Sequence, residues 1–151
     1  MSFDLKPTDM NSLKILSVLV LALWITGCSK DDSNPISDPS GVNNAVTNGT
    51  WRITYFWDTD KDETAHFSGY QFTFGTGGVL TASNGSTVIT GAWSSGTDDS
   101  GLKMVIAFSS PADFEELSED WHILEVTETK MQLQHVSGGG GGTDYLTFER
   151  N

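Results

Sequence analysis

The chain contains a single cysteine, few basic side chains and only a short apolar run near its start. One cysteine excludes an intramolecular disulfide, so the fold cannot depend on such a bond. The apolar run covers residues 15–25, which is shorter than the roughly 20 residues that a membrane-spanning helix needs. A run of this length is typical of the apolar region of a secretory signal peptide, which is removed from the mature protein.

Positive charge is scarce throughout the chain. There are 8 Lys and Arg side chains against 20 Asp and Glu, a formal net charge of -12. This balance survives removal of residues 1–27, because the charged side chains in that segment cancel. An acidic excess of this size argues against nucleic acid or an anionic lipid surface as a partner. We expect the charge to serve solubility.

The common catalytic and metal-binding signatures are also missing. No Gly-x-Ser-x-Gly elbow is present, and no pair of acids can be assigned to one cleft from spacing alone. The three histidines, His66, His122 and His135, do not have the spacing that metal sites use. The sequence therefore predicts no enzymatic activity, no metal site and no cofactor.

Two loops resemble ligand-binding motifs only in part. Residues 58–63 start like a calcium loop, but Glu63 stands where the motif has glycine and Gly69 where it has glutamate. The glycine run at residues 138–142 lacks the Lys and the helix that a phosphate-binding loop needs. We expect a solvated acidic loop in the first case, with a weak cation site as the alternative, and a flexible hairpin loop in the second.

At the end of the apolar run the chain reads Ile25-Thr26-Gly27-Cys28. This segment resembles the lipobox of bacterial lipoproteins. The resemblance implies cleavage after Gly27, a diacylglyceryl thioether on Cys28 and membrane attachment through this N-terminal lipid anchor. Residues 1–27 would then be the signal peptide, and Met10 is a better start than Met1 because it leaves a positively charged leader. The alternative reading is a cysteine buried in a core helix.

Residues 28–45 contain few apolar side chains, which predicts a disordered tether. The tether carries Lys30-Asp31-Asp32 just after the cysteine, and this run resembles the export signal of Bacteroidetes lipoproteins. The resemblance implies an outer-membrane protein that faces the cell exterior. A location on the periplasmic side of the outer membrane stays open.

Residues 46–151 alternate short Trp-, Tyr-, Phe-, Val-, Ile- and Thr-rich segments with Gly, Asn, Asp and Ser, as antiparallel β structure does. We expect one all-β domain with eight strands at residues 50–57, 69–74, 79–82, 87–93, 102–108, 121–127, 130–136 and 144–149. The even number and regular spacing predict a closed, antiparallel up-and-down barrel. One short helix is expected at residues 111–117, between the fifth and sixth strands.

Alternating side chains within these segments predict which faces point into the barrel. The expected inward residues are Trp51, Ile53, Tyr55, Trp57, Tyr70, Phe72, Phe74, Leu102, Met104, Ile106, Phe108, Met131, Leu133 and His135. Their bulk predicts a mostly filled interior. Any remaining space should open towards the loops at residues 58–63 and 138–142.

Gly49-Thr50-Trp51 opens the first predicted strand, and Arg150 follows the last. A Gly-x-Trp at this place in an up-and-down barrel resembles the lipocalin pattern, and the whole chain is similar to small lipocalin-like lipoproteins of Bacteroidetes. The resemblance implies that Arg150 packs over Trp51 at one end of the barrel. It also implies a binding or interaction module.

Four further aromatic residues, Trp57, Tyr70, Trp93 and Trp121, are candidates for the rim of a ligand pocket, since amphipathic rings suit small organic molecules. Ordinary barrel core is the alternative reading. Three functions stay open: a monomeric binding module for a small apolar or glycan-like ligand, an accessory lipoprotein that binds another envelope protein, and, with the least support, an enzyme.

Overall fold

The computed structural model describes residues 36–151. The predicted signal peptide, the choice between Met1 and Met10, and the lipidation of Cys28 all fall outside the described residues. Within residues 36–151, no helix is both long enough and apolar enough to cross a membrane.

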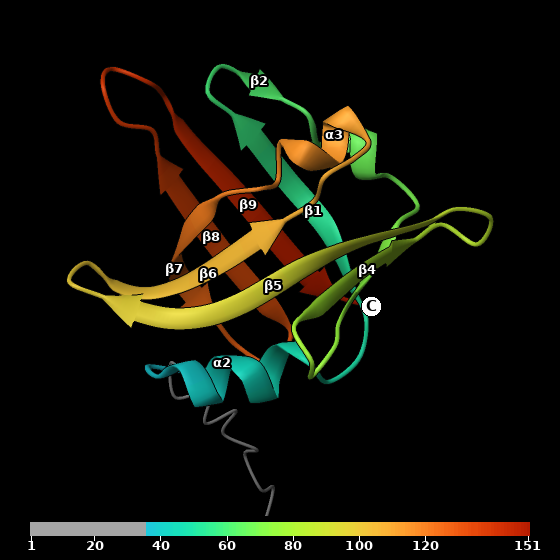
Figure 1. Cartoon of the computed structure of the whole chain (residues 1–151), viewed down its shortest axis with the longest axis horizontal. Coiled ribbons are helices and arrows are strands. Elements are labelled where there is room, and N and C mark those ends of the chain that lie inside the picture. Colours follow the sequence, from blue (N-terminus) through green and yellow to red (C-terminus); the bar gives the residue numbers. More distant parts are fainter. Residues whose placement is uncertain (1–35) are drawn as a thin grey trace, which may run out of the picture. The chain divides into compact units, whose positions relative to one another are not determined.

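Nine strands form one antiparallel sheet (Figure 1). They are β1 (Trp51–Asp58), β2 (Lys61–Asp62), β3 (Gln71–Phe74), β4 (Val79–Ser83), β5 (Val88–Asp98), β6 (Gly101–Ala107), β7 (Asp120–Val126), β8 (Lys130–Val136) and β9 (Thr143–Arg150). Each of the eight predicted strands is present. The short β2 was not predicted, and it pairs only with the end of β1. The glycine run at residues 138–142 connects β8 to β9, as expected of a hairpin loop.

The sheet closes because β1 pairs with both β3 and β9. The predicted eight-stranded, antiparallel up-and-down barrel, a lipocalin-like architecture, is thereby confirmed. Closure satisfies the edges that an open sheet would leave unpaired. The first and last strands of the barrel are therefore neighbours, as in the register pair Trp51 and Arg150.

A bulge in β1 overturns part of the predicted inward face. The register with β9 shifts between Ile53 and Tyr55. Such a bulge inserts a residue and reverses the alternation beyond it. Phe56 is consequently buried, whereas Tyr55 is 40% exposed and Trp57 is half-buried. The prediction that Tyr55 and Trp57 point inward was wrong for this reason.

The predicted tether ends earlier than expected. Helix α2 (Pro39–Val46) has Asp38 as its N-cap, whose carboxylate accepts a hydrogen bond from the Gly41 amide at 3.0 Å. Val42 and Val46 on its inner face are fully buried. The folded domain therefore includes the helix, and the boundary at residue 46 and disorder up to residue 45 are corrected.

The interior is filled mainly by large apolar side chains, as predicted. Those with the least exposure are Trp51, Trp121, Phe56, Phe67, Phe72, Phe74, Phe114, Phe148, Leu80, Met104, Ile106 and Leu117. Most of the predicted inward residues on β3, β6 and β8 belong to this core. His135 is an exception, since 20% of its side chain is exposed.

Opposite ends of the barrel are covered by different elements (Figure 1). We call the first the α2 end; it carries α2, the start of β1 and the turn between β3 and β4. The second, the α3 end, carries β2, the 3₁₀ helix η1 (Thr64–Phe67) and α3 (Ala112–Glu115). The short helix α3 lies in the predicted connection, and its Phe114 ring meets Phe67 edge-on at 5.3 Å between centroids.

Candidate functional site

Trp51 and Arg150 build the cover of the α2 end. The indole Nε1 of Trp51 donates to the carbonyl of Val46 at 2.8 Å, and the Arg150 guanidinium carbon lies 5.2 Å from the Trp51 ring centroid. Arg150 Nη2 also donates to the carbonyl of Ala45 at 2.9 Å. These contacts pair two carbonyls at the C-terminal end of α2, which have no partner within the helix. The arrangement is the one that the Gly-x-Trp resemblance implies.

Gly49 lets the chain turn from α2 into β1. Its φ is +96°, a left-handed conformation in which a side chain is strained. A Cβ at this position would also lie 3.6 Å from Arg150 Cδ and Nε. The left-handed backbone conformation therefore favours glycine here, whereas the space around the residue would admit a Cβ atom.

A cleft of about 290 Å³ lies beside α2. Its lining carries no charged side chain and consists of Asn43, Asn44, Thr47, Thr76, Gly78, Trp93, Ser94 and Ser95. Trp93 is 7% exposed, and its Nε1 donates to the Gly75 carbonyl at 3.0 Å. The Ser95 hydroxyl donates to Asn43 Oδ1 at 2.8 Å, which holds β5 against the helix.

The other three aromatic candidates have different surroundings. Trp57 donates to the backbone of Thr59, and Tyr70 packs edge-on against Phe114. Trp121 is fully buried and donates to the Leu117 carbonyl at 3.0 Å. Of the four candidates, Trp93 is the one that lines the cleft.

The position of this cleft differs from the expected one. We predicted space near the loops at residues 58–63 and 138–142, which lie at the α3 end, whereas the cleft lies at the α2 end. The reason is that Phe67 and Phe114, from elements outside the predicted strands, fill the barrel at the α3 end. Small side chains of β5 and the β3–β4 turn leave space beside α2 instead.

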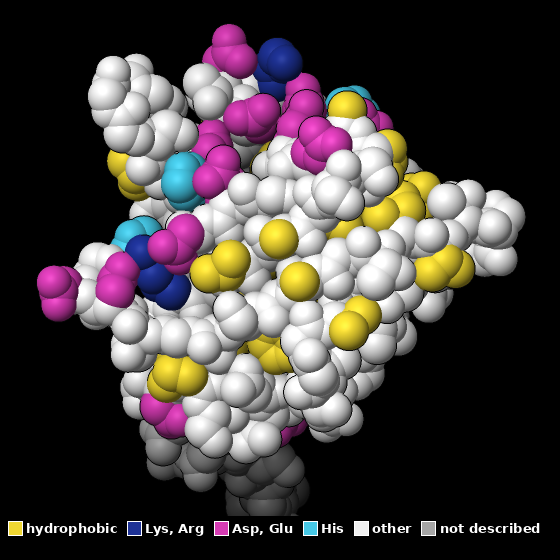
Figure 2. Space-filling view, viewed as in Figure 1, with side chains coloured by type: hydrophobic (Ala, Val, Ile, Leu, Met, Phe, Trp, Pro, Cys, Tyr) yellow, Lys and Arg dark blue, Asp and Glu magenta, His cyan; other side chains and the backbone are white. Residues whose placement is uncertain are grey.

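Acidic side chains gather at the α3 end (Figure 2). The acidic segment at residues 58–63 forms a hairpin, in which Asp58 pairs with Lys61. Its last residue, Glu63, is buried at 9% exposure, so the expectation of a fully solvated loop was wrong at this residue. The Glu63 amide donates to the carbonyl of Phe56 at 2.9 Å, which places its side chain on the rim of the barrel.

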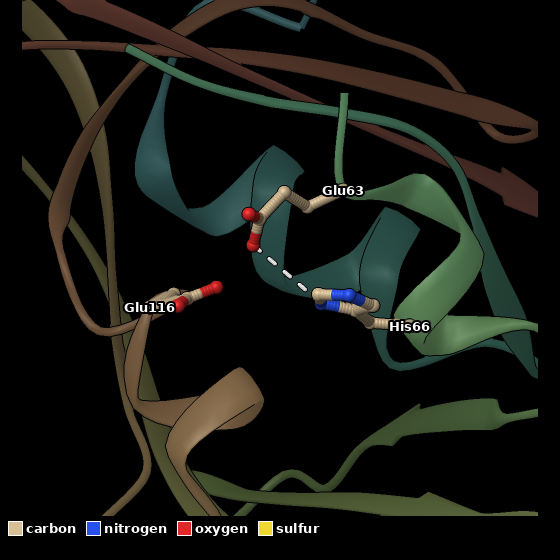
Figure 3. Close-up of side chains that lie close together, drawn as sticks. All are labelled: Glu63, His66 and Glu116. Atoms are coloured by element: carbon tan, nitrogen blue, oxygen red, sulfur yellow. Dashed lines mark ion pairs between the residues drawn. The ribbon is translucent and has the colours of Figure 1, made fainter. Parts of the chain in front are cut away.

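Glu63, His66 and Glu116 converge at this rim (Figure 3). One nitrogen or oxygen atom from each lies within 4.8 Å of the others. His66 Nδ1 is 3.5 Å from Glu63 Oε2, while Lys61 Nζ is 3.2 Å from Glu63 Oε1. His66 and Glu116 are exposed, so a solute can reach the group from solvent.

The two carboxyl groups titrate as a pair. Burial, together with the neighbouring Glu63 carboxylate, raises the pKa of Glu116 from 4.5 to about 7. The neighbouring Glu116 carboxyl group and the Lys61 ammonium group lower the pKa of Glu63. At mildly acidic pH the shared proton therefore resides on Glu116 while Glu63 is ionised, because two neighbouring carboxylates repel each other.

Sequence reasoning missed this group because Glu63 and Glu116 are 53 residues apart, and no pattern links positions so distant in the chain. A local signal was present in Glu63-Thr64-Ala65-His66. A carboxylate and an imidazole three residues apart lie on one side of a helical turn. The position of the third residue, Glu116, depends on how the β6–β7 connection folds over η1.

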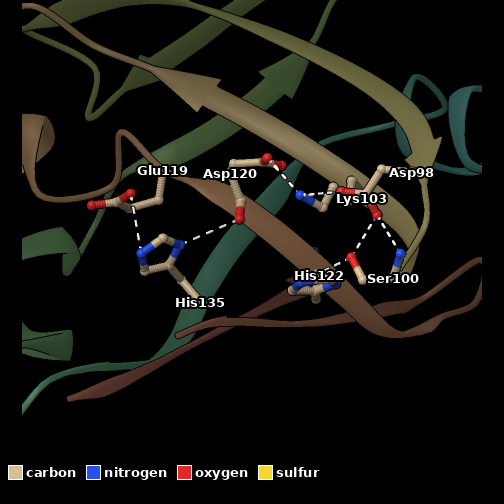
Figure 4. Close-up of polar contacts among 7 residues, drawn as sticks. All are labelled: Asp98, Ser100, Lys103, Glu119, Asp120, His122 and His135. Carbon is tan, nitrogen blue, oxygen red and sulfur yellow. Dashed lines mark hydrogen bonds and ion pairs between the residues drawn. The ribbon is translucent and has the colours of Figure 1, made fainter. Parts of the chain in front are cut away.

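A second polar network lies on β5, β6 and β7 (Figure 4). Asp98 accepts hydrogen bonds from Lys103 and Ser100, and these donors hold the pKa of Asp98 below its usual range. Ser100 Oγ lies 3.4 Å from His122 Nε2. A catalytic triad needs the carboxylate on the histidine, but here Asp98 binds the serine and the ammonium group. The network therefore stabilises the β5–β6 turn.

The third histidine makes contacts of a structural kind. His135 Nε2 lies 3.4 Å from a carboxylate oxygen of Glu119, and its Nδ1 lies 3.3 Å from the Asp120 carbonyl (Figure 4). Its ring also packs edge-on against Trp121. With both ring nitrogens engaged, His135 fixes the start of β7 to β8.

No protein-family model matches this chain, and no curated protein matches it. The fold is similar to the crystal structure of a DUF4847 family protein from Bacteroides vulgatus ATCC 8482, with 18% sequence identity and a TM-score of 0.48. The similarity covers 73% of this chain and 97% of that protein. An antiparallel barrel of this kind is compatible with a binding module.

Proposed function

We propose that this protein is a lipid-anchored binding module of the outer membrane that faces the cell exterior and holds a small, uncharged, glycan-like ligand beside α2. The observation that carries the proposal is the cleft of about 290 Å³ with Trp93 in a lining of amide and hydroxyl side chains. Its volume approaches the lower end of the range for small-molecule pockets.

The chemistry of the lining favours a sugar over an apolar ligand. Asn and Ser side chains donate and accept hydrogen bonds, as sugar hydroxyls require. The face of an aromatic ring can pack against the apolar C–H side of a pyranose. A fatty acid or a haem-like molecule would need an apolar cavity, whereas the barrel core is occupied by side chains such as Phe72 and Met104.

The proposed location rests on the sequence. The lipobox ending at Cys28 and the Lys30-Asp31-Asp32 run support a lipid anchor and export to the outer face. Residues 29–35 separate Cys28 from the first described residue, and seven residues reach at most about 25 Å. A lipid on Cys28 would therefore keep the domain close to the membrane surface.

The module is proposed to act without catalysis. Ser100 Oγ lies 3.4 Å from His122 Nε2, as a nucleophile and its base would. Asp98 accepts the serine hydrogen bond and does not orient the histidine, so the arrangement does not activate a nucleophile.

Calorimetric titration with a panel of neutral oligosaccharides, fatty acids and haem-like dyes tests the ligand class. We expect saturable binding of an oligosaccharide, weakened at least about tenfold by Asn44→Ala or Trp93→Phe, a loss of about 1.4 kcal/mol. Trp57→Phe is the matched control, because Trp57 lies outside the cleft. Stoichiometric binding of a fatty acid, or equal loss in the control, would refute the proposal.

The anchor is tested separately with Cys28→Ser. The serine hydroxyl cannot form the thioether, so the variant should remain an uncleaved precursor without labelled fatty acid. In intact cells, the parent protein should be digested by added protease. Full protection of a lipidated parent protein would place it on the periplasmic side instead.

An exterior aromatic strip supports a second candidate function, in which the protein binds another envelope protein. Trp57 pairs with Tyr145 across β1 and β9, and Tyr55 lies two residues away on the same outer surface. Tyr55 and Tyr145 are 40% and 37% exposed, and large aromatic side chains are enriched in interfaces. A photo-crosslinker at Tyr145 should then capture one defined protein in intact envelopes, whereas one at Val88 on the distant β4–β5 hairpin should not.

A further inference from the structure

We propose that Glu63, His66 and Glu116 form a binding site for one divalent transition-metal ion, with Zn²⁺ as the ion that the donor set fits best. The site lies at the α3 end of the barrel, so it is independent of the proposed cleft beside α2 (Figure 3).

The first reason is an unpartnered oxygen. Only 10% of the Glu63 side chain is exposed, and its Oε2 is buried without a hydrogen bond, with the His66 Nδ1 atom 3.5 Å away. A buried carboxylate oxygen without a partner is unfavourable, because burial removes the water that would otherwise solvate it. This oxygen points towards His66 and Glu116 (Figure 3), where a cation could satisfy it.

Glu63 is positioned by its surroundings before any ion binds. Its backbone amide is held by Phe56 of β1, and Lys61 Nζ holds the other carboxylate oxygen at 3.2 Å. His66 follows one turn later on η1. In known metal sites, hydrogen-bond partners of this kind orient the side chains that bind the metal. Two of the three ligands are therefore prearranged by the sheet and by one turn of 3₁₀ helix.

The spacing lets one ion reach all three side chains after they rotate towards one another. Ligand atoms about 2.1 Å from a tetrahedral zinc ion lie about 3.4 Å apart. The three ligand atoms here lie within 4.8 Å of one another. Closing the remaining gap needs rotation of His66 and Glu116, both of which are exposed.

The charges favour a cation. Two carboxylates face each other with one Lys61 ammonium beside them, and Asp58 and Asp113 add further negative charge near Glu116. One imidazole nitrogen with carboxylate oxygens suits zinc and its first-row neighbours, whereas calcium prefers oxygen ligands alone. The exposed side of the group leaves coordination positions for water or for an atom of a partner.

A bound ion would connect two elements that are distant in sequence. Glu63 is the N-cap of η1 and His66 lies within it, while Glu116 lies directly after α3. Beneath them, Phe67 and Phe114 are already in edge-on contact. The ion would thus fasten the β6–β7 connection over the barrel and stabilise the folded state by mass action.

The experiment uses the full-length chain, purified in detergent without a histidine tag and treated with EDTA. Zn²⁺, Mn²⁺ and Ca²⁺ are titrated by calorimetry, and the zinc form is examined by X-ray absorption. The variants are His66→Gln and Glu116→Gln, with Glu63→Gln as a third. Glu115→Gln and His122→Gln are matched controls, because they remove a neighbouring exposed acid and a half-buried histidine outside the group.

We expect one Zn²⁺ per chain, a spectrum with one imidazole and only oxygen ligands besides, and at least about tenfold weaker binding in His66→Gln and Glu116→Gln. The controls should stay within about twofold. Stoichiometric binding that persists unchanged in both ligand variants would overturn the proposal. So would equal loss in the controls, tighter binding of Ca²⁺, or no zinc binding at all.

Glu63→Gln changes a buried residue, so the far-UV circular dichroism spectrum of this variant is first compared with that of the parent protein to check that it folds. Since His66 and Glu116 are exposed, the conclusion depends on their variants even if Glu63→Gln fails to fold. Oligosaccharide binding at the α2 end should be unaffected by all of these changes, so failure of one proposal leaves the other intact.

Discussion

The two ends of the barrel are closed by different means. At the α2 end, Trp51 and Arg150 donate hydrogen bonds to the carbonyls of Val46 and Ala45, while Arg150 Nε is buried without a partner. At the α3 end, aromatic rings fill the interior, but the rim above them holds two facing carboxyl groups and a buried oxygen without a partner.

This difference separates a structural cover from a candidate site. Satisfied polar groups and a large buried ring lower the free energy of the folded state. Unsatisfied or repelling charges raise it, and they persist where an ion or ligand can compensate for them. The α2 cover should therefore be costly to break, whereas changes at the α3 rim should be tolerated or even stabilising.

The largest effect is expected for Trp51→Ala. The side chain is fully buried, so its loss should reduce the free energy of unfolding by about 3–5 kcal/mol. Urea unfolding followed by circular dichroism measures it. Trp57→Ala serves as control, since that ring is half-buried. A reduction below about 1 kcal/mol would mean that the Gly-x-Trp pattern has no structural role here.

Arg150→Met should reduce the free energy of unfolding by a smaller amount, about 1–3 kcal/mol. The change removes the hydrogen bond to the Ala45 carbonyl and leaves that group unpaired. The control is Arg52→Met on the outer surface, where the ion pair with Glu149 is exposed and worth under about 1 kcal/mol. Thermal unfolding of both variants compares them. Equal losses would show that Arg150 contributes only as a surface charge.

Asp38→Ala tests whether α2 belongs to the folded domain. Loss of the N-cap to the Gly41 amide should cost about 1 kcal/mol, and Asp38→Asn should restore most of it, since asparagine caps equally well. Hydrogen exchange at the amides of Val42 and Val46 should accelerate in the alanine variant. Fast exchange in the parent itself would favour a disordered segment up to residue 45.

The smallest effect is expected for Glu116→Gln, and it is a gain in stability. The folded-state pKa of about 7 lies above the ordinary 4.5, so ionising Glu116 between these values destabilises the folded state. The variant should match the parent below about pH 4.5 and exceed it by less than about 1 kcal/mol above pH 7, given the exposure of the group. Glu115→Gln, which changes the neighbouring exposed acid, is the control in thermal unfolding.

Local pattern was enough for much of this fold. Strand alternation and turn residues depend on neighbours within a few positions, so all eight barrel strands, the closing Gly49 and Trp51, and the short helix after β6 were predictable from the sequence. The acidic balance that argues against nucleic acid is likewise a property of composition alone.

Long-range packing decided the rest. The bulge that turns Tyr55 and Trp57 outward arises where β1 meets β9, and α2 is a short helix that depends on burying Val42 and Val46. Trp93 meets α2 to form the cleft, and Glu116 meets Glu63, only after the barrel has closed. These contacts join residues whose separation along the chain carries no periodic signal, so the tertiary structure alone determines them.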